Sequence, residues 1–202
     1  MNSLLGVLQT VYRQHVSTRR ELAEYTGLSA GRISTLVTQL LQQHVLMEEL
    51  SQEGTPGRPA GALYVNPTAG RVVGLDIGGR TTRAILADLG GQTLASLIHP
   101  TRAVPDRQVI LGDIVDTINA VCEQGGVRPD TLLALGVGVQ GIVDTRNGIV
   151  LGWPNTPSWA SAWSGLDLPA ALRALLAHDL ILVDDSVRAM GATAYRFGRA
   201  QD

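Results

Sequence analysis

The segment Val73–Gly91 holds residues whose types and spacing fit phosphate chemistry. An apolar strand ends at Asp76, the pair Gly78 and Gly79 forms a turn, and a second strand leads to Asp88. A turn without side chains lets backbone N–H groups approach a phosphate, and an aspartate at a strand end can hold hydrated magnesium. The same pattern also describes an ordinary tight hairpin, so the functional interpretation depends on the rest of the chain.

A second group of candidate residues lies in residues 17–46, where a short helix, a glycine turn and a longer helix follow one another. The longer helix exposes hydroxyl groups and an arginine, which fit the major groove of DNA, where arginine pairs with guanine. The candidate DNA contacts are Arg19, Arg20, Ser29, Arg32, Ser34, Thr35 and Thr38. The alternative is a helical hairpin with a solvated face. The turn spacing, the apolar positions and the hairpin that follows favour DNA binding.

Arg58 is a further candidate contact, because it stands between Gly57 and Pro59 in a stretch rich in these two residue types. An arginine held extended at the tip of a wing can enter a narrow minor groove. A stiff wing tip or linker without a DNA contact is the alternative interpretation.

The elements that must position the DNA contacts are three helices and a two-stranded hairpin. The first helix ends near His15, the second runs from a cap at Ser17 or Thr18 to Gly27, and the third runs from Ser29 to Gln43. Strands are predicted at residues 45–50 and 62–65. The apolar residues expected to face inward are Leu4, Leu5, Leu8, Val11, Tyr12, Leu22, Ala23, Tyr25, Ile33, Leu36, Val37, Leu40 and Leu41. This order predicts a winged helix-turn-helix DNA-binding domain over residues 1–67.

The remainder, residues 71–202, predicts a second domain of the α/β class. Three strands follow one another and are succeeded by alternating helices and strands, which indicates a mixed sheet. The predicted strands are 71–77, 83–88, 92–99, 132–139 and 180–183, and the predicted helices are 106–124, 168–178 and 187–197.

Composition excludes several classes of protein. With 45% hydrophobic and 17% charged residues the chain is a folded globular protein, and its net charge of -2 argues against indiscriminate coating of nucleic acid. No apolar run is long enough to span a membrane, so we expect a cytoplasmic protein. Cys122 is interpreted as a small buried apolar residue, and the dispersed histidines as surface or helix-end residues. We therefore expect no metal site and no cofactor.

Two further motifs connect these observations: GVGVQGIVDTRNGIVLGWPNTPSW at residues 136–159 and ILVDDSVRAMGATAYRFG at residues 181–198. With the N-terminal module, they resemble the bacterial ROK family of sugar-responsive repressors and sugar kinases. The resemblance implies an actin-like, ribonuclease-H-like ATPase fold, and its repressor branch begins with a winged helix-turn-helix followed by a Gly-Arg-Pro segment. It further implies that Asp76, Gly78 and Gly79 match the phosphate loop, Asn155 a sugar-contacting asparagine and Asp185 the general base of the kinases.

Several positions depart from the family pattern. Arg80 stands where the kinases have threonine, Asp184 and Asp185 replace an Asn-Asp pair, and Val187 replaces an asparagine. Complete members continue beyond the equivalent of Asp202 with a zinc site of histidine and cysteines. The second domain is therefore expected to be an incomplete N-terminal lobe.

Together these observations predict a transcriptional repressor of sugar-metabolism genes. It is expected to bind double-stranded operator DNA as a homodimer, with a sugar or sugar derivative as a further partner and no membrane association. The kinase-like domain is predicted to be catalytically incompetent, with Asp185 as a vestigial general base. The alternatives are a ROK-type sugar kinase that phosphorylates a hexose or N-acetylated hexosamine, and a DNA-binding module whose second domain serves only for dimerisation.

Overall fold

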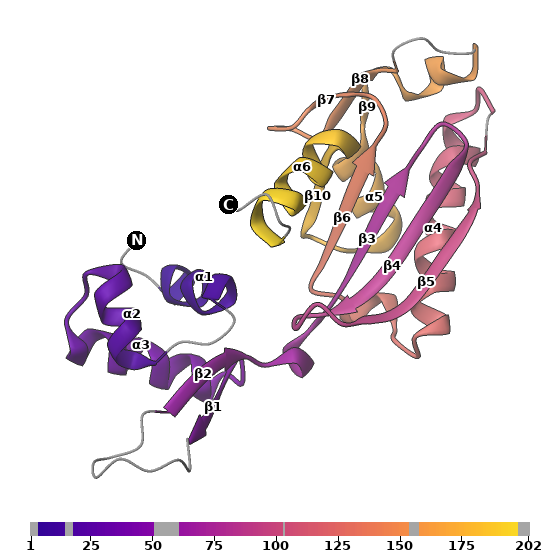
Figure 1. Ribbon diagram of the computed structural model, residues 1–202. Helices are drawn as coiled ribbons and strands as arrows, with labels where there is room; N and C mark the ends of the chain where they lie inside the picture. The colour runs from indigo at the N-terminus through magenta and orange to yellow at the C-terminus, as the bar shows by residue number, and fades with distance from the viewer. Residues whose placement is uncertain (1–3, 15–17, 51–60, 103, 154–157, 198–202) are drawn as a thin grey trace. The chain divides into compact units, whose positions relative to one another are not determined.

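The computed structural model describes residues 4–14, 18–50, 61–102, 104–153 and 158–197 of the chain (Figure 1). Two compact units are distinguished, Met1–Ala69 and Gly70–Asp202. None of the described helices is long and apolar enough to cross a membrane.

The first unit is a winged helix-turn-helix, as the sequence predicts. Its elements are α1 (Leu4–Gln14), α2 (Arg19–Thr26), α3 (Ala30–Gln42), the strands β1 (Leu46–Leu50) and β2 (Gly61–Val65), and a 3-10 turn at Pro67–Ala69. The strands are antiparallel, with Leu46 opposite Val65 and Leu50 opposite Gly61. Burial of apolar area between the three helices and the hairpin supplies the driving force for this fold. The buried core consists of Val7, Val11, Leu22, Ile33, Leu36, Val37, Leu40, Leu46 and Leu63.

The predicted inward faces of α1 and α2 require correction at three residues. Leu5, Tyr12 and Tyr25 are 61%, 40% and 62% exposed, although each was expected to face inward. In α1 the stripe that packs inward is Leu4, Val7, Leu8 and Val11, which follows the three- and four-residue spacing of one helix face. Leu5 and Tyr12 are seven residues apart and lie on the flank of that stripe.

The second unit is built on a five-stranded mixed sheet, which confirms the predicted fold class. The strands are β3 (Arg71–Ile77), β4 (Thr81–Asp88), β5 (Thr93–Pro100), β6 (Ala134–Val139) and β10 (Ile181–Asp185). Their spatial order is β10-β6-β3-β4-β5, in which β10, β6 and β3 run parallel and β3, β4 and β5 antiparallel. The long helices are α4 (Arg107–Gln124), α5 (Leu168–Leu176) and α6 (Ser186–Phe197).

A second, three-stranded sheet was not predicted from the sequence. It consists of β7 (Ile142–Asp144), β8 (Ile149–Gly152) and β9 (Leu166–Asp167), in the order β7-β8-β9. Short 3-10 segments at Pro129–Thr131 and Ser158–Trp163 complete the unit. Strands of two to four residues are too short for alternation of apolar and polar residues to identify them.

The sheet buries alternate residues of each strand on one face, where α4 and α5 pack. Val73, Leu75 and Ile77 of β3 are buried, whereas Gly74 and Asp76 lie on the opposite face. This alternation follows from the two-residue period of a strand. It places Asp76 on the face of the sheet opposite the core.

Cys122 is fully buried in the α4 core, as predicted, and burial raises the pKa of its thiol. The interpretation of His99 as a simple surface residue is wrong. His99 is half-buried, and its Nε2 lies 2.8 Å from the Thr117 Oγ1, so the ring links β5 to α4.

Candidate nucleic-acid interface and cleft

Helix α3 presents a polar face formed by side chains that the core does not use. Ser29 caps the helix, because its Oγ accepts a hydrogen bond of 3.3 Å from the backbone N–H of Arg32. The residues predicted to contact DNA from this helix are all exposed: Arg32, Ser34, Thr35 and Thr38. They lie opposite the buried stripe of the same helix.

The hydroxyl of Thr35 donates to the backbone oxygen of Gly31 over 3.1 Å, which leaves its lone pairs as acceptors. The side chains of Arg32, Ser34 and Thr38 form no hydrogen bond or ion pair with any other described residue. Their donors are therefore available to bases or phosphates without loss of a bond inside the described part of the protein.

Helix α2 begins with a capping box that fixes its orientation. The backbone N–H of Glu21 donates to the Oγ1 of Thr18 over 3.2 Å, and the Thr18 N–H donates to the Glu21 carboxylate over 2.7 Å. The backbone hydrogen bond from Thr18, followed by that from its side chain, lowers the pKa of Glu21. Gly27 ends α2 at φ 69°, a left-handed conformation that starts the turn toward α3.

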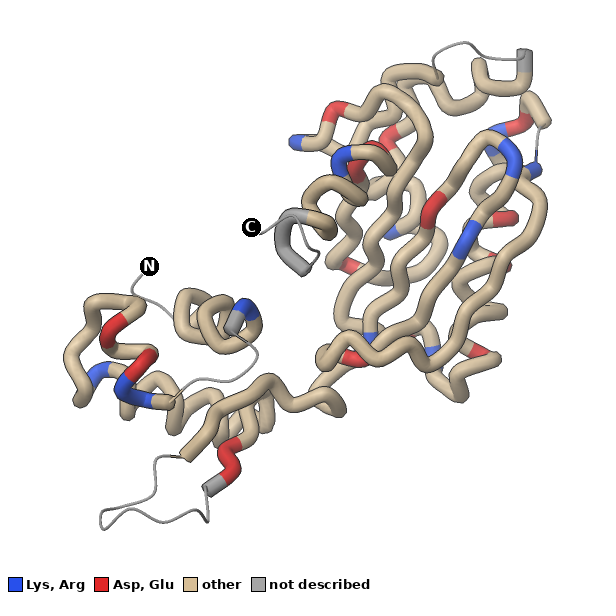
Figure 2. The backbone as a smooth tube through the Cα atoms, in the orientation of Figure 1, with Lys and Arg blue, Asp and Glu red and all other residues tan. Residues whose placement is uncertain are grey.

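Two arginines open α2, and the structure separates their roles. Arg20 is 84% exposed and has Glu24 at 3.8 Å, so its guanidinium is accessible to a phosphate. Arg19 instead forms a two-pronged ion pair with Glu48 of β1. Figure 2 shows basic and acidic residues side by side on this unit. Arg58 lies outside the described residues.

The predicted phosphate turn at Gly78 and Gly79 joins β3 to β4. The Gly78 N–H donates to Thr81 O over 3.0 Å, and the Gly79 N–H donates to the Gln140 Oε1 over 2.7 Å. Both N–H groups of the turn therefore already have acceptors within the protein. A Cβ on Gly78 would lie 2.9 Å from Thr81 O, so the tight turn requires glycine there. Arg80 follows as an exposed side chain.

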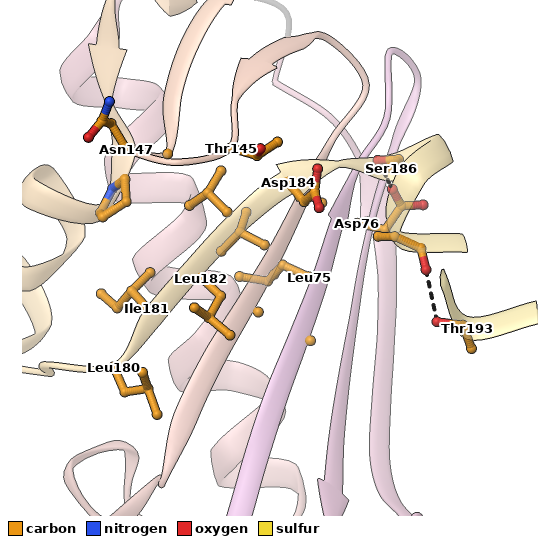
Figure 3. Close-up of a pocket in the computed structure, with 18 of the residues that line it drawn as sticks. Leu75, Asp76, Thr145, Asn147, Leu180, Ile181, Leu182, Asp184, Ser186 and Thr193 are labelled. Atoms are coloured by element: carbon orange, nitrogen blue, oxygen red, sulfur yellow. Dashed lines mark hydrogen bonds between the residues drawn. The ribbon is translucent and has the colours of Figure 1, made fainter. Parts of the chain in front are cut away.

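An open cleft of about 1060 Å³ lies beside β10, on the sheet face that carries Asp76. Its walls come from β3, β6, β10, the turn between β7 and β8, α5 and α6 (Figure 3). Asp76 accepts a hydrogen bond of 2.6 Å from Ser186 Oγ, and Figure 3 shows these two side chains meeting at one end of the cleft. Gly138 permits this contact, because a Cβ there would lie 3.2 Å from the Ser186 Oγ.

Asp184 lines the cleft, whereas Asp185, Gly78 and Gly79 are not among its lining residues. Within the described residues, no three His, Cys, Asp or Glu side chains form a group that could hold a metal ion. Asn155 lies outside the described residues.

Asp185 caps helix α6. Its Oδ1 accepts a hydrogen bond of 2.8 Å from the Arg188 N–H, and its own N–H donates to the Asp184 Oδ1 over 2.8 Å. The Arg188 Nε lies 3.4 Å from Asp184 Oδ1 and 4.0 Å from Asp185 Oδ2. The carboxylates of Asp184 and Asp185 thus lie near the same arginine, Arg188. These bonds give Asp185 a structural role as the N-terminal cap of α6.

Three residues of these sites were missed by sequence reasoning: Glu48, Gln140 and Ser186. Ser186 directly follows the strand-end aspartates, which is a detectable signal. Gln140 and Glu48 are linked to Gly79 and Arg19 only through the fold, 61 and 29 residues away in the chain.

Comparison with known proteins places these features in one family. The model of the ROK family matches residues 72–202. The xylose repressor of Bacillus subtilis is 29% identical over 83% of this chain and 42% of its own length. A solved structure of a ROK family transcriptional regulator, a homologue of the E. coli Mlc protein, covers 96% of this chain and 49% of its own, with TM-score 0.73 and 19% identity.

A ROK family glucokinase from Streptomyces griseus, solved with glucose and AMPPNP, is 26% identical over 65% of this chain and 38% of its own, with TM-score 0.55. The chain spans about two fifths of the length of the xylose repressors that it matches. The fold of the second unit is therefore part of the sugar-kinase fold of this family.

Proposed function

Because the chain belongs to the ROK family, we propose that it is a transcriptional regulator that binds duplex DNA through α3. The observation that carries this proposal is the exposed polar face of α3 in a winged helix-turn-helix. A helix with this outer face and a buried inner stripe can enter the major groove while the rest of the unit supports it. The likeness to the B. subtilis xylose repressor and to the Mlc homologue supports the same function.

The regulator is proposed to act as a homodimer that represses sugar-metabolism genes. Two copies of α3 in a dimer reach two half-sites about one helical turn of DNA apart. The duplex that the protein selects should accordingly contain an inverted repeat.

Selection of bound duplexes from a random pool by the full chain tests this proposal. We expect enrichment of an inverted repeat by the native chain. Ser34→Glu, which places a negative charge on the α3 face, should abolish enrichment. Ser96→Glu makes the same change at an exposed serine of β5 in the second unit and should leave enrichment intact. If Ser34→Glu enriched the inverted repeat as strongly as Ser96→Glu does, DNA binding through α3 would be contradicted.

A sugar or sugar derivative is proposed as the second partner, bound weakly by the second unit. Asn155 and Asp185 supply only part of the polar shell that specific sugar recognition needs. All three tryptophans of the chain, Trp153, Trp159 and Trp163, belong to this unit, and the centroid of Trp153 lies 5.3 Å from each of the other two. Their fluorescence should therefore report sugar binding near Asn155 without a signal from the DNA-binding unit.

Titration of hexoses and pentoses against the preformed protein–duplex complex measures the coupling. A ligand can shift DNA binding only by its difference in affinity for the two states, so a weakly held sugar should release little DNA. Release at micromolar sugar would contradict the weak-binding proposal.

Sugar phosphorylation is the second candidate function, favoured by the likeness to the S. griseus glucokinase. Two features oppose it. Both N–H groups of the glycine turn already have acceptors, and the exposed side chain of Arg80 adds bulk and charge directly after the turn. Phosphoryl transfer requires phosphates, metal and nucleophile to be positioned together. We propose that the chain does not catalyse it.

A coupled assay with ATP, magnesium and a panel of hexoses and N-acetylated hexosamines tests the absence of kinase activity. Turnover that Asp185→Asn abolishes would establish the kinase function and contradict the proposal.

A further inference from the structure

Glu48 occupies an inward-facing position of the β1–β2 hairpin. Strand residues alternate between two faces, so Glu48 shares a face with Leu46, which is 2% exposed. Glu48 also pairs in register with Leu63, which is fully buried, and directly opposed residues project from the same face. Glu49, the next residue, is exposed on the other face. The structure therefore holds a carboxylate against the core of the first unit.

Arg19 compensates this carboxylate. Its Nη1 contacts the Glu48 Oε1, and its Nη2 donates to the Oε2 over 3.1 Å, so both prongs of the guanidinium are engaged. The Arg19 and Glu48 side chains are 35% and 22% exposed, which shields the pair from much of the solvent. Removal of either partner would leave a half-buried charge without its counter-ion, which is costlier than removal of both.

The pair joins three elements of the unit. Arg19 is the first residue of α2, and Glu48 is the central residue of β1. The Glu48 side chain also lies across the start of β2, where a Cβ on Gly61 would overlap it. The ion pair therefore fixes the β1–β2 hairpin against the N-terminus of α2.

We propose that Arg19 and Glu48 are positioning residues for DNA recognition, which fix the hairpin relative to α2, and that Arg19 does not itself bind a DNA phosphate. This inference rests on the proposed function. It revises the sequence-based expectation for Arg19 and leaves Arg20 as the phosphate contact at the start of α2.

Removal of the acidic residue gives the sharpest test. If Glu48 only repelled DNA, Glu48→Gln would tighten binding. As a positioning residue, it should instead weaken binding of the full chain to the duplex selected from the random pool, by about fivefold for a pair of this exposure. Glu49→Gln is the matched control, because it removes the same charge from the same strand without breaking the pair, and it should not weaken binding.

Salt dependence distinguishes positioning by Arg19 from phosphate binding. The plot of log affinity against log salt concentration falls with a steepness of about 0.9 for each phosphate contact, so each lost contact makes it less steep by about 0.9. Arg20→Gln should reduce the steepness of this plot by that amount, whereas Arg19→Gln should weaken binding and leave the steepness unchanged. The charge-swapped variant R19E/E48R should recover most of the affinity lost in Arg19→Gln.

A double-variant cycle on thermal unfolding tests the pair without DNA. We expect Arg19→Gln and Glu48→Gln each to lower Tm and the double variant to lower it by less than their sum. Additive losses of Tm, tighter binding by Glu48→Gln, or a slope decrease in Arg19→Gln equal to that in Arg20→Gln would each overturn the inference. Failure of the native chain to enrich any duplex would instead overturn the proposed function, while the unfolding cycle would still decide the coupling.

Discussion

Arg32→Ala should separate base recognition from general DNA affinity. Arg32 lies in the first turn of α3, is exposed, and has no side-chain bond to another described residue. The bond to the Ser29 cap comes from the backbone N–H of Arg32, so an alanine at this position keeps it. Because alanine is also a good helix former, the change in unfolding free energy should stay within about 0.5 kcal/mol.

The expected loss of binding follows from the geometry of guanine recognition. A guanidinium that donates to both guanine acceptors contributes about 1–3 kcal/mol of discrimination against other bases. Converted to affinity, this is roughly a 5- to 150-fold weaker complex with the selected duplex. A duplex with the recognised guanine replaced should bind the native chain and Arg32→Ala with nearly equal affinity.

Fluorescence anisotropy on the selected duplex and on single-base variants measures both quantities. Arg13→Ala is the matched control, because Arg13 is an exposed arginine of α1 and its removal changes the charge of the unit equally. This control should weaken binding to all duplexes alike, if at all. Equal losses by Arg32→Ala on the selected and on random duplexes would refute base recognition by this residue.

Three further expectations concern Glu21, Asp185 and Arg58. The hydrogen bonds from Thr18 lower the pKa of Glu21 below its ordinary 4.5, so the stability that it contributes is present above pH 4.5 and is lost as the pH falls through the lowered pKa. Glu21→Ala should therefore lower Tm at pH 7, and by progressively less as the pH falls below 4.5. Asp185→Ala should lose about 1 kcal/mol of stability as a lost helix cap, and Asp185→Asn much less, which urea unfolding measures. Arg58→Ala should weaken preference for A·T-rich flanks in duplex selection, and flank indifference in both proteins would contradict a minor-groove contact.

Periodicity predicted the elements of the fold where they were long enough to repeat. The stripe Ile33, Leu36, Val37 and Leu40 of α3 is buried as expected, because a 13-residue helix contains several turns of the pattern. Tyr25 shows the limit of this reasoning. In the eight-residue α2 only Leu22 is buried, and an aromatic residue three positions later is exposed.

The candidate sites were predicted less completely than the fold, because most of their geometry depends on contacts between distant segments. The exposed hydroxyls and the arginine of α3 could be identified from one helix alone. The ion pair of Arg19 requires Glu48, and the hydrogen bond of the Gly79 N–H requires the side chain of Gln140. No local pattern specifies either partner, since a polar residue in a strand or after it is equally compatible with solvent.

The distribution of satisfied polar groups favours DNA over nucleotide as the ligand of this chain. On α3, the side chains of Arg32, Ser34 and Thr38 form no bond to another described residue, so bonds to DNA would replace only bonds to water. In the second unit a phosphate at Gly79 would first displace the Gln140 carbonyl, a bond of 2.7 Å. Such a bond contributes about 0.5–1.5 kcal/mol net to stability, so the interaction of a phosphate with Gly79 must be more favourable than this before phosphate binding lowers the free energy. The same turn therefore supports a stable β3–β4 hairpin more directly than it supports nucleotide binding.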